Sequence, residues 1–78
     1  MHRREALKLI EADMKTHNMK EVGFITDCRT YLTVTAKSEK GDFYRYIYDD
    51  LCKYVRRFHL TEQLSTEVYI GTVESEVR

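Results

Sequence analysis

The side chains that could do acid–base chemistry are few and widely spaced. Asp13 and His17 are four residues apart, so they would meet on one face of a helix. A carboxylate beside a histidine can form a general base. The same spacing fits a structural role, because the helix dipole favours a cation near the C-terminus of a helix. We favour the structural interpretation and predict no catalytic residue.

The cysteines, histidines and glycines also lack the spacing that chemistry requires. Cys28 and Cys52 are the only cysteines, and together with the three histidines they match no familiar arrangement of zinc ligands. Gly23, Gly41 and Gly71 lie far apart, whereas a phosphate-binding loop needs clustered glycines. The sequence therefore predicts no metal and no cofactor, and we expect the chain not to be an enzyme.

A basic cluster ends the aromatic-rich segment 43–60. Lys53, Arg56 and Arg57 lie close together there, followed by His59. Such a cluster could contact the phosphates of a nucleic acid or an acidic partner, or could only compensate a helix dipole. The thirteen basic and thirteen acidic residues cancel, which argues against a protein held mainly by a nucleic-acid backbone. Binding of nucleic acid by these three cations is therefore the alternative function.

Length and composition are those of one small globular domain. The chain has 78 residues, of which 42% are hydrophobic and 33% charged. We expect residues 1–78 to fold as a single domain whose last residues, 73–78, fray. Glu11 and Asp13 interrupt the first apolar run, so no signal peptide is indicated. Two cysteines without a C-x-x-C pair suit a reducing compartment, and the expected location is the cytoplasm.

Hydrophobic spacing predicts a helix followed by a hairpin. The helix is expected over residues 3–17, with Asn18 as its end. The runs 21–27 and 29–37 alternate and predict two antiparallel strands. The residues expected to face inward from these elements are Ala6, Leu7, Ile10, Met14, Val22, Phe24, Leu32, Val34 and Ala36.

The segment 43–60 permits two interpretations. Its first half, FYRYIY, has high β-propensity and predicts a strand over 43–48. Leu51, Tyr54, Val55 and Phe58 have helical spacing, which predicts a helix over 50–59 with Asp49 as its cap. One long helix from residue 42 is the other interpretation. We favour the strand followed by the helix, and we expect a final strand over 66–73.

The expected element order, α-β-β-(β)-α-β, defines the fold class and the candidate surface. It predicts an α+β two-layer sandwich, with two helices on one face of a three- or four-stranded, mainly antiparallel sheet. The uncovered sheet face would carry tyrosine and apolar side chains of the kind found at interface centres, namely Ile25, Tyr31, Tyr69 and Val73. We therefore expect a protein-interaction module, such as a regulator, adaptor or inhibitor, that binds a protein partner or a second copy of itself as a homodimer. No membrane and no small-molecule substrate is expected.

Overall fold

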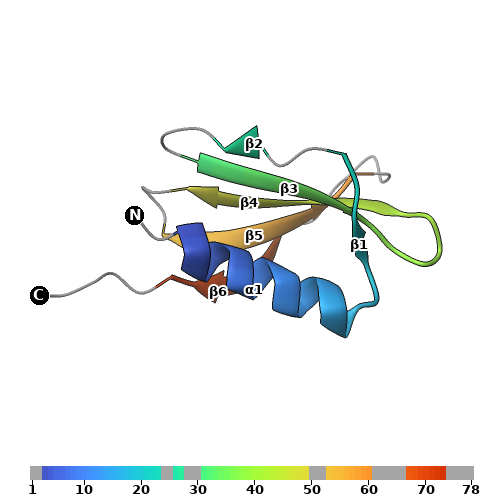
Figure 1. Ribbon diagram of the computed structural model, residues 1–78, viewed down its shortest axis with the longest axis horizontal. Helices are drawn as coiled ribbons and strands as arrows, with labels where there is room; N and C mark the ends of the chain where they lie inside the picture. The colour runs from blue at the N-terminus through green and yellow to red at the C-terminus, as the bar shows by residue number, and fades with distance from the viewer. Residues whose placement is uncertain (1–2, 24–25, 28–30, 50–52, 61–66, 74–78) are drawn as a thin grey trace, which may run out of the picture.

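A single helix lies across one face of an antiparallel sheet in the described part of the protein (Figure 1). The computed structural model describes residues 3–23, 26–27, 31–49, 53–60 and 67–73. Within them the elements are α1 (Arg3–Thr16), β1 (Lys20–Glu21), β2 (Thr26–Asp27), β3 (Tyr31–Lys37), β4 (Phe43–Asp49), β5 (Tyr54–His59) and β6 (Val68–Thr72). The strands follow the order β1-β3-β4-β5-β6, and β2 pairs with β3 beside β1.

The predicted sandwich with two helices on a three- or four-stranded sheet is wrong. Residues 54–59, expected to end a second helix, form β5, so five strands follow one another across the sheet. Tyr54, Val55 and Phe58 have helical spacing, but aromatic and β-branched side chains also suit a pleated surface with a strand on each side. Residues 50–52 lie outside the described residues. Asp49, expected as the cap of that helix, is the last residue of β4, and the strand expected over 43–48 is confirmed.

The first helix forms where the hydrophobic spacing predicts it. Ala6 and Ile10 are fully buried, and Leu7 and Met14 pack against the same core. With 14 residues, α1 is shorter than the ~20 residues that a bilayer-crossing helix needs. Nowhere in the described ranges is there a helix with the length and apolarity to cross a membrane.

Asn18 ends the helix through a Schellman motif. Its φ of 55° is left-handed, a conformation that asparagine tolerates better than most residues. The Met19 N–H donates to the Met14 carbonyl at 2.8 Å, and the Asn18 N–H donates to the Lys15 carbonyl at 3.2 Å. These two bonds satisfy carbonyls that the end of a helix leaves unpaired. The predicted stop at Asn18 is confirmed.

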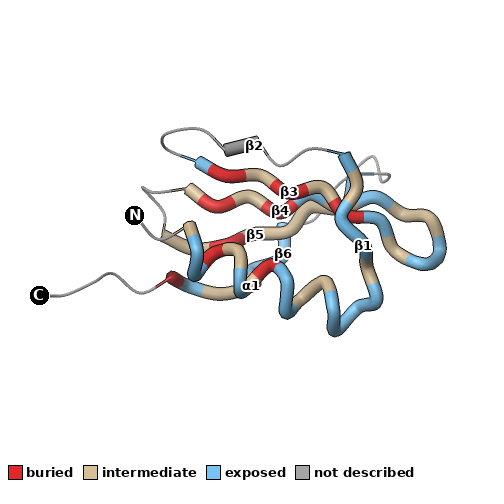
Figure 2. Tube along the Cα trace, viewed as in Figure 1, coloured by how far each residue is buried: buried red, intermediate tan, exposed pale blue. Residues whose placement is uncertain are grey.

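The hydrophobic core lies between α1 and the sheet. Buried residues alternate along β3 and the second half of β4, as Figure 2 shows, and these residues are Leu32, Val34, Ala36, Tyr46 and Tyr48. Val55 in β5 and Val73 just after β6 complete this layer. Phe24, expected to face inward, and Leu51, expected on the apolar side of the second helix, lie outside the described residues. Because strand side chains alternate, the remaining residues of each strand form a second face, which α1 leaves uncovered.

The predicted hairpin forms, but its first strand is interrupted. Glu21 is opposite Ala36, whereas Thr26 is opposite Thr33. The first strand therefore advances five residues while β3 advances three. Gly23, with φ of 75°, lies within this excess, and glycine adopts positive φ without steric cost. The expected strand over 21–27 is thus replaced by β1 and β2.

Candidate binding surface on the open face of the sheet

We call the side of the sheet opposite α1 the open face. Strand alternation and the register of neighbouring strands define its members. They are Tyr31, Thr33, Thr35 and Lys37 from β3, Phe43, Arg45, Ile47 and Asp49 from β4, Tyr54, Arg56 and Phe58 from β5, and Tyr69 and Thr72 from β6. Three of these side chains are cations. Six are aromatic or aliphatic, namely Tyr31, Phe43, Ile47, Tyr54, Phe58 and Tyr69.

On the β5–β6 half of the open face, an arginine lies between aromatic rings. The guanidinium carbon of Arg56 is 5.4 Å from the ring centre of Tyr54 and 5.9 Å from that of Phe58. The Tyr54 ring is in turn 5.8 Å from the Tyr69 ring. Glu67 offers Arg56 only a long ion pair, at 3.9 Å. Cation–π contact therefore supports this guanidinium at the surface.

On the β3–β4 half, the open face is hollowed. The hollow has a volume of about 710 Å³, and Tyr31 and Phe43 line it with exposed fractions of 38% and 37%. Arg45 also lines it, together with the hydroxyl-bearing Thr33 and Thr35. The hollow therefore offers aromatic surfaces, a cation and hydrogen-bonding groups to one ligand.

The four residues predicted to bind a protein partner do not form one patch. Tyr31 and Tyr69 lie on the open face, and Tyr69 is 60% exposed. Val73 is buried in the core with an exposed fraction of 2%. Ile25 lies outside the described residues.

A bulge explains the position of Val73. Val55 is opposite Gly71, whereas Arg56 is opposite Tyr69, so Ile70 is an extra residue in β6. An extra residue reverses the alternation beyond it. Simple alternation from Tyr69 places Val73 on the open face, and the bulge returns Val73 to the α1 side.

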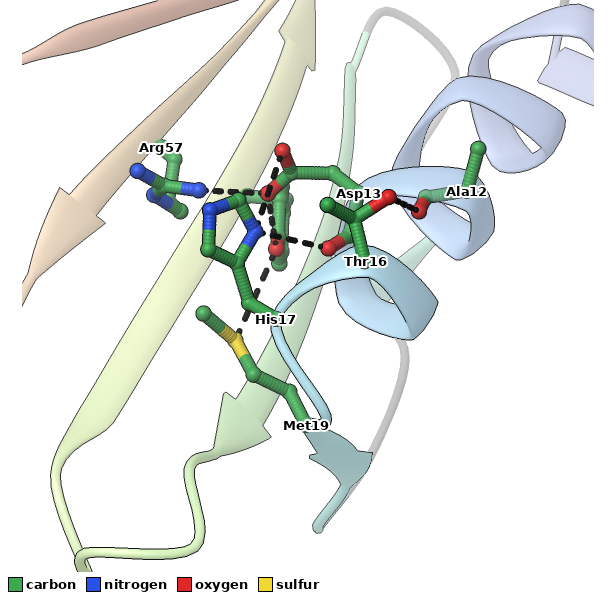
Figure 3. Close-up of polar contacts among 7 residues, drawn as sticks. Ala12, Asp13, Thr16, His17, Met19 and Arg57 are labelled. Carbon is green, nitrogen blue, oxygen red and sulfur yellow. Dashed lines mark hydrogen bonds and ion pairs between the residues drawn. The ribbon is translucent and has the colours of Figure 1, made fainter.

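The three predicted nucleic-acid-binding cations are also separated. Arg56 lies on the open face, but its neighbour Arg57 lies on the α1 side. Figure 3 shows Arg57 facing Asp13 of α1, and its Nη1 donates to Asp13 Oδ2 at 2.5 Å. Lys53 lies just before β5 with a left-handed φ of 65°. A cluster formed by all three at the end of a second helix is therefore wrong, since that helix does not form.

Asp13 is the centre of a polar network on the α1 side. The Tyr46 hydroxyl donates to Asp13 Oδ2 at 2.6 Å, the oxygen that also accepts from Arg57. The Nδ1 atom of His17 is 2.9 Å from the backbone oxygen of Asp13 and 3.5 Å from its Oδ1. Asp13 therefore joins helix and sheet, which supports its structural interpretation.

Burial and the charge of Asp13 control protonation in this network. Burial, followed by the hydrogen bond and charge of Asp13, raises the pKa of the Tyr46 phenol well above its usual value, against a smaller opposing effect of Arg57. Burial lowers the pKa of Arg57, but the hydrogen bond and charge of Asp13, together with the contact to Tyr46, outweigh burial and raise that pKa overall. The phenol therefore stays neutral and the guanidinium stays charged.

The sequence analysis did not assign Phe43, Arg45 and Ile47 to the candidate binding surface. The alternation within 43–49 was the signal that could have placed them on one face. Within the described residues, no three histidine, cysteine, aspartate or glutamate side chains gather as metal ligands would.

No family model matches the chain, and neither do curated proteins or solved structures.

Proposed function

We propose that this chain is a small non-enzymatic binding module whose open face binds single-stranded nucleic acid. The observation that carries the proposal is the placement of Arg56 between the rings of Tyr54 and Phe58, with Tyr69 beside them. Exposed rings stack on bases of any sequence, and interleaved cations attract the phosphates between those bases.

We further propose that the protein acts in the cytoplasm, where its two cysteines would remain thiols.

The β3–β4 half of the open face supports the same ligand. Tyr31 and Phe43 offer two more rings, and Arg45 provides a second guanidinium beside them. The volume of this hollow, about 710 Å³, falls within the usual range for small-molecule sites, so it has room for a nucleotide. The zero net charge of the whole chain does not oppose this proposal, because the phosphates would contact only the cations of the open face.

A protein, or a second copy of the chain, is the competing occupant of the open face. The predicted apolar patch has lost Val73 to the core, which weakens that expectation. Tyr and Arg are also common at protein interfaces, so the experiment must separate the two occupants.

The test measures fluorescence anisotropy of a labelled single strand of about twelve nucleotides, a length within the range that such modules cover. We expect micromolar or tighter binding at low salt, weaker binding to a duplex of the same sequence, and steep loss of affinity as salt rises. Tyr69→Ala should weaken binding about tenfold, in line with the loss of one stacked base.

Arg56→Gln and Arg4→Gln form a matched pair for the charge. Both remove one positive charge, but Arg4 is exposed on α1, away from the open face. We expect Arg56→Gln to weaken binding and Arg4→Gln to leave it nearly unchanged. Equal effects of the two variants, or no binding at low salt, would overturn the proposal. A dimer that dissociates on Tyr69→Ala, without affinity for the single strand, would assign the open face to a second copy.

A further inference from the structure

Two lysines oppose each other at the edge of the sheet. Lys20 of β1 is directly opposite Lys37 of β3, and both are exposed. Like charges at directly opposite positions of an antiparallel pair repel each other. A bound anion between or beside them would relieve that repulsion.

A third lysine lies beside this pair. One hollow of about 290 Å³ is lined by Lys20, Lys37, Asn18 and Glu39, together with Ser38. A second hollow, of about 310 Å³, is lined by Lys15 and also by Asn18, Lys20 and Glu39. The two hollows share lining residues and therefore adjoin. Figure 1 shows why these residues meet, since the end of α1, β1 and the β3–β4 turn gather at the same end of the molecule, on the right of the view.

Lys37 connects this region to the open face. Its Nζ atom is 5.4 Å from the ring centre of Phe43, which lines the large hollow of the open face. A nucleic acid whose base stacks near Phe43 would therefore bring its next phosphates toward Lys37.

We propose that Lys15, Lys20 and Lys37 form a lysine track that binds phosphates of a single strand leaving the open face over the β1 edge. This inference rests on the proposed function, and it adds the route that the backbone takes beyond the stacked bases. Lysine binds phosphate as a point charge, so the track adds affinity without reading sequence. The carboxylate of Glu39 lines both hollows and opposes the track.

The length and salt dependence of binding test the lysine track. Lys15→Gln combined with Lys20→Gln removes two cations of the track and leaves the contact between Lys37 and Phe43 intact. For a strand of about twelve nucleotides, the slope of log affinity against log salt should fall by about 1.4, because each phosphate contact on a single strand contributes about 0.7. A strand of about four nucleotides, which covers only the open face, should bind wild type and variant equally.

Two further variants make the test specific. Lys8→Gln combined with Arg4→Gln removes the same charge from exposed positions of α1 outside the track, and should leave the slope unchanged. Glu39→Gln should tighten binding of the longer strand by about twofold to fivefold, the size expected for one exposed charge. Circular dichroism and thermal melting confirm that each variant is folded.

The outcomes separate the track from the open face. If Arg56→Gln weakens binding but the Lys15/Lys20 variant keeps the wild-type slope, the track is refuted and the proposed function stands. If Glu39→Gln weakens binding, the assigned role of the track is also wrong. If the wild type binds neither strand at low salt, the proposed function and the track fall together.

Discussion

Asp13 and Arg57 are 44 residues apart in the chain, and an ion pair of 2.5 Å joins them between α1 and β5. Each side chain is only 15% exposed, so water screens the pair weakly. The same carboxylate oxygen accepts the Tyr46 hydroxyl of β4. One carboxylate thus ties the helix to two central strands.

Asp13→Ala should destabilise the fold by about 3 kcal/mol, because it leaves the largely buried Arg57 guanidinium and the Tyr46 hydroxyl without their acceptor. Urea unfolding followed by circular dichroism measures this change. The control is Glu11→Ala, an exposed acidic position on the same helix, which should change stability by less than about 0.5 kcal/mol. Similar losses for both variants would contradict a special role of Asp13.

The raised pKa of Tyr46 makes stability fall in alkaline solution. The unfolded phenol ionises near its ordinary pKa of about 10, whereas the folded phenol keeps its proton to higher pH. The contribution is therefore complete below about pH 10 and is lost as pH rises through the folded pKa. Tyr46→Phe should lose less stability than wild type between about pH 10 and 12, as denaturant titrations at each pH would measure. A parallel decline of the two proteins would count against this assignment.

The end of α1 can be tested at Asn18. Alanine there places a β-carbon in the left-handed conformation and should cost about 1 kcal/mol, whereas glycine should be neutral or stabilising. For a domain of this size, 1 kcal/mol corresponds to a fall in Tm of about 4–8 °C. Calorimetry of both variants checks the order, and a glycine variant less stable than the alanine variant would refute the Schellman assignment.

The close approach of α1 to β6 can be tested at Gly71. A β-carbon at this position would lie 3.2 Å from both Cδ atoms of Leu9. Gly71→Val should therefore overpack the contact and destabilise by about 1–3 kcal/mol. With Leu9→Ala present, the valine gains space and should cost about 1 kcal/mol less. Additive losses in this double-mutant cycle would show that Leu9 is not the obstacle.

The elements with one clear period could be predicted from the sequence. Ala6 and Ile10 recur at helical spacing, and Leu32 and Val34 alternate, so α1 and β3 lie where expected. The end of α1 at Asn18 was also predictable, because asparagine is a residue type that commonly ends helices. The segment 54–59 was assigned wrongly, because Val55 and Phe58 satisfy a helical period while the aromatic and β-branched residue types of the segment suit a strand. Pairing with β4 and β6, which local spacing does not reveal, decides between them.

The candidate surface was predictable only in part, for a similar reason. Tyr31 and Tyr69 could be placed on one face by alternation alone. The assignment of Val73 required knowledge of the extra residue Ile70. Gly71 beside Ile70 was the one signal of it in the residue types, because an isolated glycine inside a strand often marks a bulge. In the expected helix, Arg56 and Arg57 belonged to the same basic cluster. In a strand, neighbouring side chains point to opposite faces of the sheet, so the two arginines are separated.

The adjacency of Arg56 and Arg57 has a consequence for how β5 can change in length. Arg56 contacts aromatic rings of the open face while Arg57 holds Asp13, so one peptide bond separates a cation of the open face from a structural one. A substitution at either arginine changes only one face of the sheet. Deletion of a single residue within β5 would instead exchange the two environments, exposing the structural arginine and pushing the other beneath α1. Insertions and deletions in this strand should therefore survive only in pairs of residues, whatever their composition.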